Sequence, residues 1–164
     1  DSLVLTDLLD RLLEAEEGDA GVDLSLKVAD MKLASGDPPG AERALLSGFK
    51  ANPRNPELKG RLTQLYNERG DRVGLARLTA AEARFVTDTQ AKRDLLIGSA
   101  ETIKNEGDQH EAADLYAEAL DVDPADRDTL FSYLETCANT GQHARGIAAG
   151  QAAPVPLLAV PFGR

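Results

Sequence analysis

Apolar residues recur at helical spacing along most of the chain, in segments separated by four evenly placed glycines. Gly36, Gly70, Gly107 and Gly141 recur at intervals of about 34 residues, and the middle interval is longer than the other two by three residues. Each glycine stands between two segments whose apolar positions repeat every three or four residues, as in amphipathic helices. The pattern therefore predicts four equivalent turns, each between two paired helices.

Side chains at fixed distances from these glycines indicate that the paired helices pack closely. Small residues stand five and twelve positions after Gly107, at Ala112 and Ala119, with Tyr116 between them at nine. The same offsets after Gly36 hold Ala41, Leu45 and Gly48. Small side chains let two helix backbones approach, and the bulky residue between them fills the remaining gap.

The helix boundaries follow from capping signals. Asn55 precedes Pro56 and Asp37 precedes Pro38, while Asp108 with Glu111 forms a capping-box pattern. Nine helices and no strand are expected, at residues 3–16, 23–35, 39–51, 56–69, 72–86, 90–106, 109–121, 127–140 and 143–151. Three extra residues predict a longer helix at 72–86. Gly146 and Gly150 predict a short, weak helix at 143–151.

The segment GDQHEAADLYAEALDVDP, residues 107–124, resembles the tetratricopeptide repeat (TPR) family. The likeness lies in the turn glycine, the two small positions, the aromatic residue and the final proline. GDPPGAERALLSGFKANP, residues 36–53, is similar, with Leu45 in the aromatic position. The chain departs from the family where a first-helix tryptophan is usual, since the corresponding residues are Ser25, Lys59, Leu96 and Leu130.

This resemblance implies an all-α fold, a right-handed α-solenoid of stacked antiparallel helix pairs with a concave face lined mostly by first helices. Residues 1–21 are then an N-terminal amphipathic helix, the end of a preceding repeat or a cap. Residues 22–153 are four TPR-like repeats, at 22–55, 56–92, 93–126 and 127–153. Residues 154–164 are a proline-interrupted apolar tail, and both ends look like cuts in a longer protein.

Charge and composition narrow the function. With 18 Lys and Arg against 28 Asp and Glu, the net charge is −10, which disfavours nucleic acid and anionic membranes as partners. No apolar run reaches the roughly 18 residues of a membrane-spanning helix. The single cysteine, Cys137, excludes an internal disulfide. Arginine exceeds lysine 12 to 6, which suggests a bacterial source, and we expect a cytoplasmic protein, or a periplasmic one if a signal peptide was removed.

Family geometry places residues ten and six before each turn glycine in the concave groove. Three of the four positions six before the glycine are carboxylates, where neither capping nor the helix dipole requires an acid. Apart from Gly60, the residues at these positions are Leu26, Asp30, Gln64, Ile97, Glu101, Phe131 and Glu135, and Arg61 beside Gly60 is added as a candidate groove residue. An acidic, partly apolar groove of this kind suits a peptide with basic and apolar side chains. Solvated polar positions in an acidic protein are the alternative interpretation.

The motifs that resemble catalytic or metal-binding sites are incomplete in this sequence. The aspartates at 121, 123, 126 and 128 resemble a calcium loop, but Asp126 and Ser132 stand where that loop needs glycine and glutamate. His110 and His143 lack zinc-site spacing, and Cys137 has the position of a packed thiol. We expect no enzyme activity, no cofactor and no metal.

The sequence thus favours a non-catalytic protein-binding scaffold, part of a larger protein or assembly. The alternative is an architectural spacer or self-association module without a dedicated peptide ligand. In that case the apolar tail packs on the open last repeat or on a second copy, as a homo-oligomer. A regulatory segment of an enzyme whose catalytic domain lies elsewhere is a third and more distant interpretation.

Overall fold

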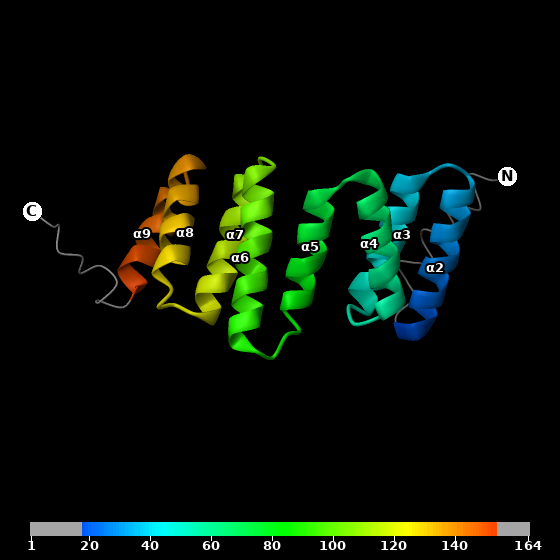
Figure 1. Ribbon diagram of the computed structural model, residues 1–164, viewed down its shortest axis with the longest axis horizontal. Helices are drawn as coiled ribbons and strands as arrows, with labels where there is room; N and C mark the ends of the chain where they lie inside the picture. Colours follow the sequence, from blue (N-terminus) through cyan, green and yellow to red (C-terminus); the bar gives the residue numbers. More distant parts are fainter. Residues whose placement is uncertain (1–17, 154–164) are drawn as a thin grey trace, which may run out of the picture. The chain divides into compact units, whose positions relative to one another are not determined.

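The computed structural model describes residues 18–153, which form eight α-helices and, within that range, no strand (Figure 1). The helices are α2 (Gly18–Ala34), α3 (Pro38–Ala51), α4 (Pro56–Arg69), α5 (Arg72–Ala83), α6 (Thr89–Asn105), α7 (Gln109–Val122), α8 (Arg127–Asn139) and α9 (His143–Ala152). The expected all-α class is confirmed for this part of the chain. The helix expected at 3–16 and the tail at 154–164 lie outside the described residues.

Contacts divide the chain into two compact units. Unit 1 ends at Asp71 and contains α2, α3 and α4, and unit 2 begins at Arg72 and contains α5 to α9. Within each unit, the extensive helix contacts are between helices that follow one another in the chain. The division falls between α4 and α5, the two helices that the sequence assigns to the repeat at 56–92.

The expectation of a longer helix at 72–86 is wrong. Helix α5 ends at Ala83 and has 12 residues, whereas α3 and α7 have 14 each. Just after the helix, the amides of Phe85 and Val86 each donate to the carbonyl three residues earlier, so the chain continues in a tighter turn. The Asp88 side chain then accepts from the Ala91 amide and begins α6. The extra residues therefore lengthen the connection, not the helix. Helix α2 begins five residues earlier than expected.

The four predicted turns have the same backbone hydrogen bonds. In each, the residue after the glycine donates its amide to the carbonyl five residues earlier, at N···O distances of 2.8–3.1 Å. The glycine amide donates to the carbonyl three residues earlier, at 3.0–3.3 Å. This is the Schellman closure, which needs a left-handed residue. The four glycines have φ between 64° and 107°, and no other described residue has a positive φ.

The predicted helix starts are also present. Asp37 and Asp108 accept from the amides three residues later, at 2.9 and 3.0 Å. Asn55 accepts from two amides of the first turn of α4. Asp126 does the same for α8, with nearly the same backbone angles as Asn55. The junctions before α4 and α8, two repeats apart in the sequence, thus have one local structure.

The core of unit 1 requires a close approach of α2 and α3. A Cβ atom added to Gly48 would lie 2.1 Å from the Ser25 hydroxyl oxygen and 2.7 Å from its Cβ, so only glycine fits. Leu45, three residues earlier, is 1% exposed and fills the space beside this contact. The small and bulky residues that the sequence places at fixed distances after Gly36 are therefore part of this packing.

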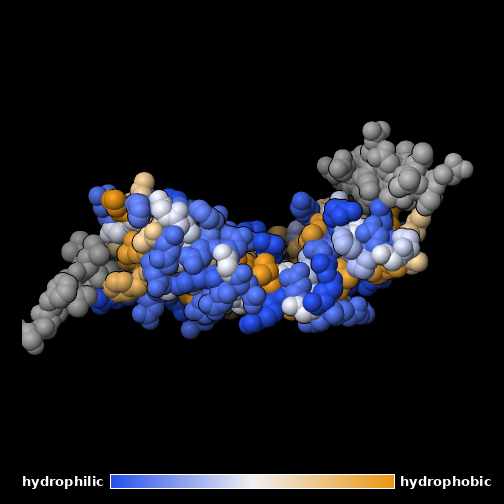
Figure 2. Space-filling view, turned by 90° about the horizontal axis from the view of Figure 1, so that it is seen from above, coloured by the Kyte–Doolittle hydropathy of each residue, from blue (hydrophilic) through white to orange (hydrophobic). Residues whose placement is uncertain are grey.

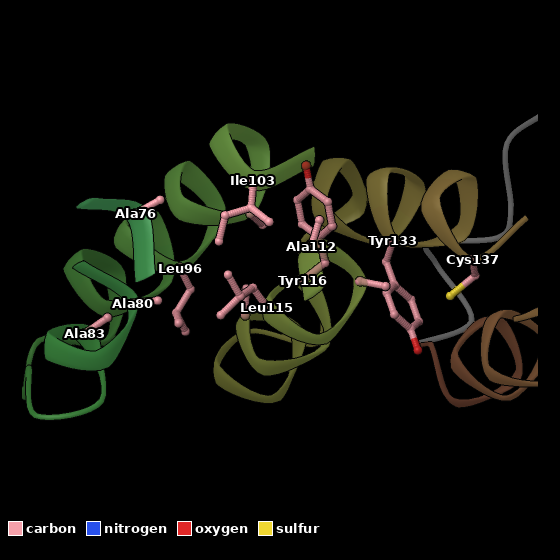
Figure 3. Close-up of a cluster of buried hydrophobic side chains, with 13 residues drawn as sticks. Ala76, Ala80, Ala83, Leu96, Ile103, Ala112, Leu115, Tyr116, Tyr133 and Cys137 are labelled. Atoms are coloured by element: carbon pink, nitrogen blue, oxygen red, sulfur yellow. The ribbon is translucent and has the colours of Figure 1, made fainter. Parts of the chain in front are cut away.

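The core of unit 2 is a continuous cluster from α5 to α9. Figure 3 shows Leu96 and Ile103 of α6 facing Leu115 and Tyr116 of α7. Alanines at Ala112 and Ala119 are fully buried and allow α7 to approach its neighbours. With few large side chains available, close helix packing supplies the buried contacts.

Two glycines, one at the end of α4 and one inside it, provide a direct test of the turn. Gly70→Ala should lower the free energy of unfolding by about 1–2 kcal/mol, because an L side chain is strained at φ 64° and ψ 26°. Gly60→Ala is the matched control: Gly60 is exposed within the helix with open space around it, so alanine should add about 0.5–1 kcal/mol. Urea unfolding followed by circular dichroism measures both, and equal effects would contradict the assignment of the turn.

Candidate functional site

Within unit 1, the predicted groove residues lie on α2 and α4. Asp30 of α2 and Arg61 of α4 form an ion pair, so these two helices lie side by side although α3 separates them in the chain. Leu26 is partly buried on the same helix as Asp30, and Gln64 is exposed on α4. The structure therefore brings Asp30 and Arg61 together, but as partners that neutralise each other.

A pocket of about 260 Å³ lies beside this pair. Its walls include Arg61 and Gln64 from the predicted set, together with Leu33, Leu45, Leu65 and Glu68. Gln64 donates to the Glu68 carboxylate at 2.8 Å. Sequence reasoning missed Leu33, which is 41% exposed, although its position three residues after Asp30 places it on the same helix face.

Within unit 2, the predicted groove residues lie on α6 and α8. Ile97 and Glu101 are four residues apart on α6, as Phe131 and Glu135 are on α8, so each pair shares a helix face. The Lys104 ammonium lies 2.5 Å from the Glu135 carboxylate and joins the two helices. Phe131 is 58% exposed, and Glu101 is exposed without an ion pair inside the described part of the chain.

Electrostatics link this face to the core beneath it. Burial raises the pKa of the Tyr116 phenol, and the nearby carboxylates of Glu101 and Glu135 raise it further. The hydrogen bond and charge of Lys104 lower the pKa of the Glu135 carboxyl. Glu135 is thus held in its ionised form by a neighbouring helix.

The negative charge of the predicted groove is therefore smaller than the sequence suggests. Asp30 pairs with Arg61 and Glu135 pairs with Lys104, in each case on another helix of the same unit. Of the three groove carboxylates, only Glu101 keeps an uncompensated charge within the described residues. The apolar side chain of Phe131, by contrast, is exposed and available for contact.

A second charged cluster in unit 1 was not predicted. Glu42 of α3 accepts from the Arg69 guanidinium at 2.5 Å and from the Tyr66 hydroxyl at 3.3 Å. Burial and the Glu42 carboxylate raise the pKa of Tyr66 to about 12. Tyr66 is 3% exposed, so this cluster ties the end of α4 to α3 over a buried phenol.

Helices α5, α7 and α9 of unit 2 have their own ion pairs. Arg77 of α5 and Arg84 in the turn just after α5 pair with Glu111 and Glu118 of α7, at 2.6 and 2.7 Å. Asp114 of α7 pairs with Arg145 of α9 at 2.8 Å. The members of each of the first two pairs are separated by one full repeat, a signal that sequence reasoning did not use. Ion pairs in unit 2 therefore join α5 to α7 and α7 to α9, and the Lys104–Glu135 pair joins α6 to α8.

The motifs set aside in the sequence have structural roles. Asp126 caps α8, and Asp123 and Asp126 both pair with Arg93. Cys137 is 1% exposed in the core of unit 2. Among residues 18–153, no three His, Cys, Asp or Glu side chains are grouped as metal ligands, and no helix combines the length and apolarity that a bilayer crossing requires.

No family model matches the chain, and no curated protein is detectably similar to it. The case for any function therefore depends on the residues and the geometry described above.

The Lys104–Glu135 pair can be tested by titration. Lys104→Gln should raise the pKa of the Glu135 carboxyl, because the positive charge and hydrogen bond that lower it are removed. Lys27→Gln, an exposed lysine of unit 1, is the control. NMR titration of the side-chain carboxyl carbon measures the shift. An unchanged Glu135 pKa would show that the pair does not persist in solution.

The Tyr66 cluster predicts a loss of stability at high pH. The phenol ionises near pH 10 in the unfolded chain and near pH 12 in the folded one, so its contribution is present below pH 10 and lost as the pH rises towards 12. The loss should be on the order of 2 kcal/mol. Urea unfolding between pH 9 and 11 should show a smaller decline for Tyr66→Phe than for the unaltered protein, and equal declines would contradict this.

Proposed function

We propose that the chain is a TPR-like right-handed α-solenoid that serves as a non-catalytic scaffold for binding a peptide segment of another protein. The repeated architecture is supported by four turns that have the same hydrogen bonds and recur at nearly equal intervals. It is further supported by the matching junctions before α4 and α8. In this family such arrays bind protein segments on the face made by first helices.

One observation supports the location of the binding face: Phe131 is 58% exposed on α8, four residues before Glu135, which pairs with Lys104 of α6. Covering a solvent-exposed aromatic side chain with a partner lowers the free energy of the complex. Glu101 lies on the α6 face that Lys104 links to α8. The partner segment would thus bring an apolar side chain to Phe131 and a basic one to Glu101.

The pocket beside Arg61 and Gln64 is the corresponding candidate within unit 1. Leu33 and Leu65 give it apolar walls, while Gln64 and Glu68 give it a polar edge. An apolar anchor side chain with a neighbouring hydrogen-bond donor fits this lining. The two surfaces are proposed separately, each within its own unit.

An architectural role is the second candidate, and the ion pairs favour it. Asp30 and Glu135 already have basic partners on neighbouring helices, so two of the three groove carboxylates serve the packing of the protein itself. In this case the exposed face has no dedicated peptide ligand and the helices act as a spacer or self-association module.

Charge reversal separates the two functions. Glu101→Lys with Glu135→Lys should weaken binding of basic–apolar peptides about tenfold or more, because like charges then face the peptide. The loss of exposed ion pairs should cost little stability, roughly 0–1 kcal/mol per pair. Binding is measured by fluorescence polarisation, with short labelled peptides selected on the unaltered protein from a random library.

The matched control places the same charge change on α7. Asp114→Lys with Glu118→Lys removes two exposed carboxylates, each from an ion pair, outside the proposed face. This variant should keep peptide binding. Failure to select any peptide, or equal loss in both variants, would contradict the peptide-binding function and favour the architectural one.

A further inference from the structure

The last helix pair of unit 2 leaves a cavity beside its core. A pocket of about 550 Å³ lies among α7, α8 and α9. Eight of its eleven lining residues are alanine, leucine or proline, and the others are Asp121, Tyr133 and Arg145. A concave apolar lining of this size is suited to hold apolar side chains. In Figure 2, apolar residues are visible at this end of unit 2.

The preceding helix pair shows which side chain is missing from the pocket. Leu115 stands eight residues after Gly107, and Ala149 stands eight residues after Gly141. Leu115 is 5% exposed and belongs to the core of unit 2, whereas Ala149 lines the pocket. The pocket therefore lies where the earlier pair has a leucine side chain.

An ion pair is also missing at the same end of α9. Arg84, in the turn just after α5, pairs with Glu118 of α7, and the residues at the same offsets from the next two glycines are Asp121 and Ala152. Alanine cannot pair with a carboxylate, so this bridge is lost. The other bridge is kept with exchanged charges, as Asp114 with Arg145 in place of Arg77 with Glu111. Helix α9 is thus bridged to α7 at its first turn but not at its last.

We propose that residues 154–160 of the same chain occupy this pocket, with Leu157 and Leu158 in place of the missing leucine. Ala152 and Ala153 form part of the pocket wall, so the segment starts at the pocket itself. Leu157 is four residues beyond Ala153, a span of up to about 14 Å for an extended chain. The inference does not rest on the proposed peptide-binding face.

The chemistry of the segment matches the lining. Residues 154–163 carry no ionisable side chain, and five of them are valine, leucine or phenylalanine. Pro154 and Pro156 favour extended backbone, which presents side chains in more than one direction without needing a helix partner. An apolar segment buried among alanine and leucine side chains is stabilised by the area it removes from water.

The first experiment observes the contact in the unaltered protein. With methyl groups of leucine and alanine labelled, nuclear Overhauser effects should connect Leu157 or Leu158 to Ala148, Ala149 or Ala152. Absence of all such effects would overturn the proposal. A sample mixed from two differently labelled chains separates the sources: effects between different chains would identify a second copy as the occupant and overturn the intramolecular form.

The second experiment is a stability cycle in the full chain. Leu157→Ser with Leu158→Ser should lower the Tm by roughly 5 °C, from the loss of buried leucine area. In a background with Ala149→Leu and Ala152→Arg, which restores the missing leucine and places a cation opposite Asp121, the same serine changes should have no effect. Equal losses in both backgrounds, or none in either, would overturn the proposal.

A matched control tests whether the loss of Tm is specific to the tail residues. Ile147 is 61% exposed on α9 and does not line the pocket. Ile147→Ser should leave the Tm within about 1 °C in both backgrounds, as expected for an exposed surface position. A drop as large as that of the tail changes would mean that any apolar loss near α9 destabilises the protein, which would also overturn the assignment.

Discussion

The left-handed glycine that closes each helix pair is the constraint on which the structure depends. At Gly36, Gly70, Gly107 and Gly141 the backbone turns through a conformation that L side chains adopt only with strain. The turn satisfies the last carbonyls of one helix with two hydrogen bonds. Gly48 and Ala119, each twelve residues after a turn glycine, are both small. Gly48 lies too close to Ser25 to carry a Cβ atom, and Ala119 is fully buried.

Ion pairs between alternate helices have a second effect beyond holding them together. The pairs of Asp30 with Arg61 and of Lys104 with Glu135 use charges that a binding groove would otherwise present to a partner. Each pair is exposed and contributes little stability by itself. Among the described residues, the predicted groove positions of α6 and α8 keep one carboxylate without an ion pair, Glu101, and one exposed aromatic ring, Phe131. A partner would therefore be selected more by apolar contact than by a strong negative field.

The last described helix pair of unit 2 packs differently from the pair before it. Within unit 2, each helix packs mainly against its neighbours in the chain. Alanine at positions 149 and 152 replaces the leucine and the charged residue of the preceding pair, and the result is an apolar pocket instead of a filled core.

The sequence by itself determined the helices, their caps and the turns, because these depend on interactions between residues close in the chain. Glycine spacing located all four left-handed turns, and Asn55, Asp37 and Asp108 located three helix starts. Local signals failed at α5, where three inserted residues fit either a longer helix or a longer connection. Only the tertiary structure decided which charges are compensated, since Arg61 and Lys104 reach partners on a different helix, with a further helix between them in the chain. It alone revealed the pocket, because an empty volume depends on side chains from three helices at once, which no single stretch of sequence specifies.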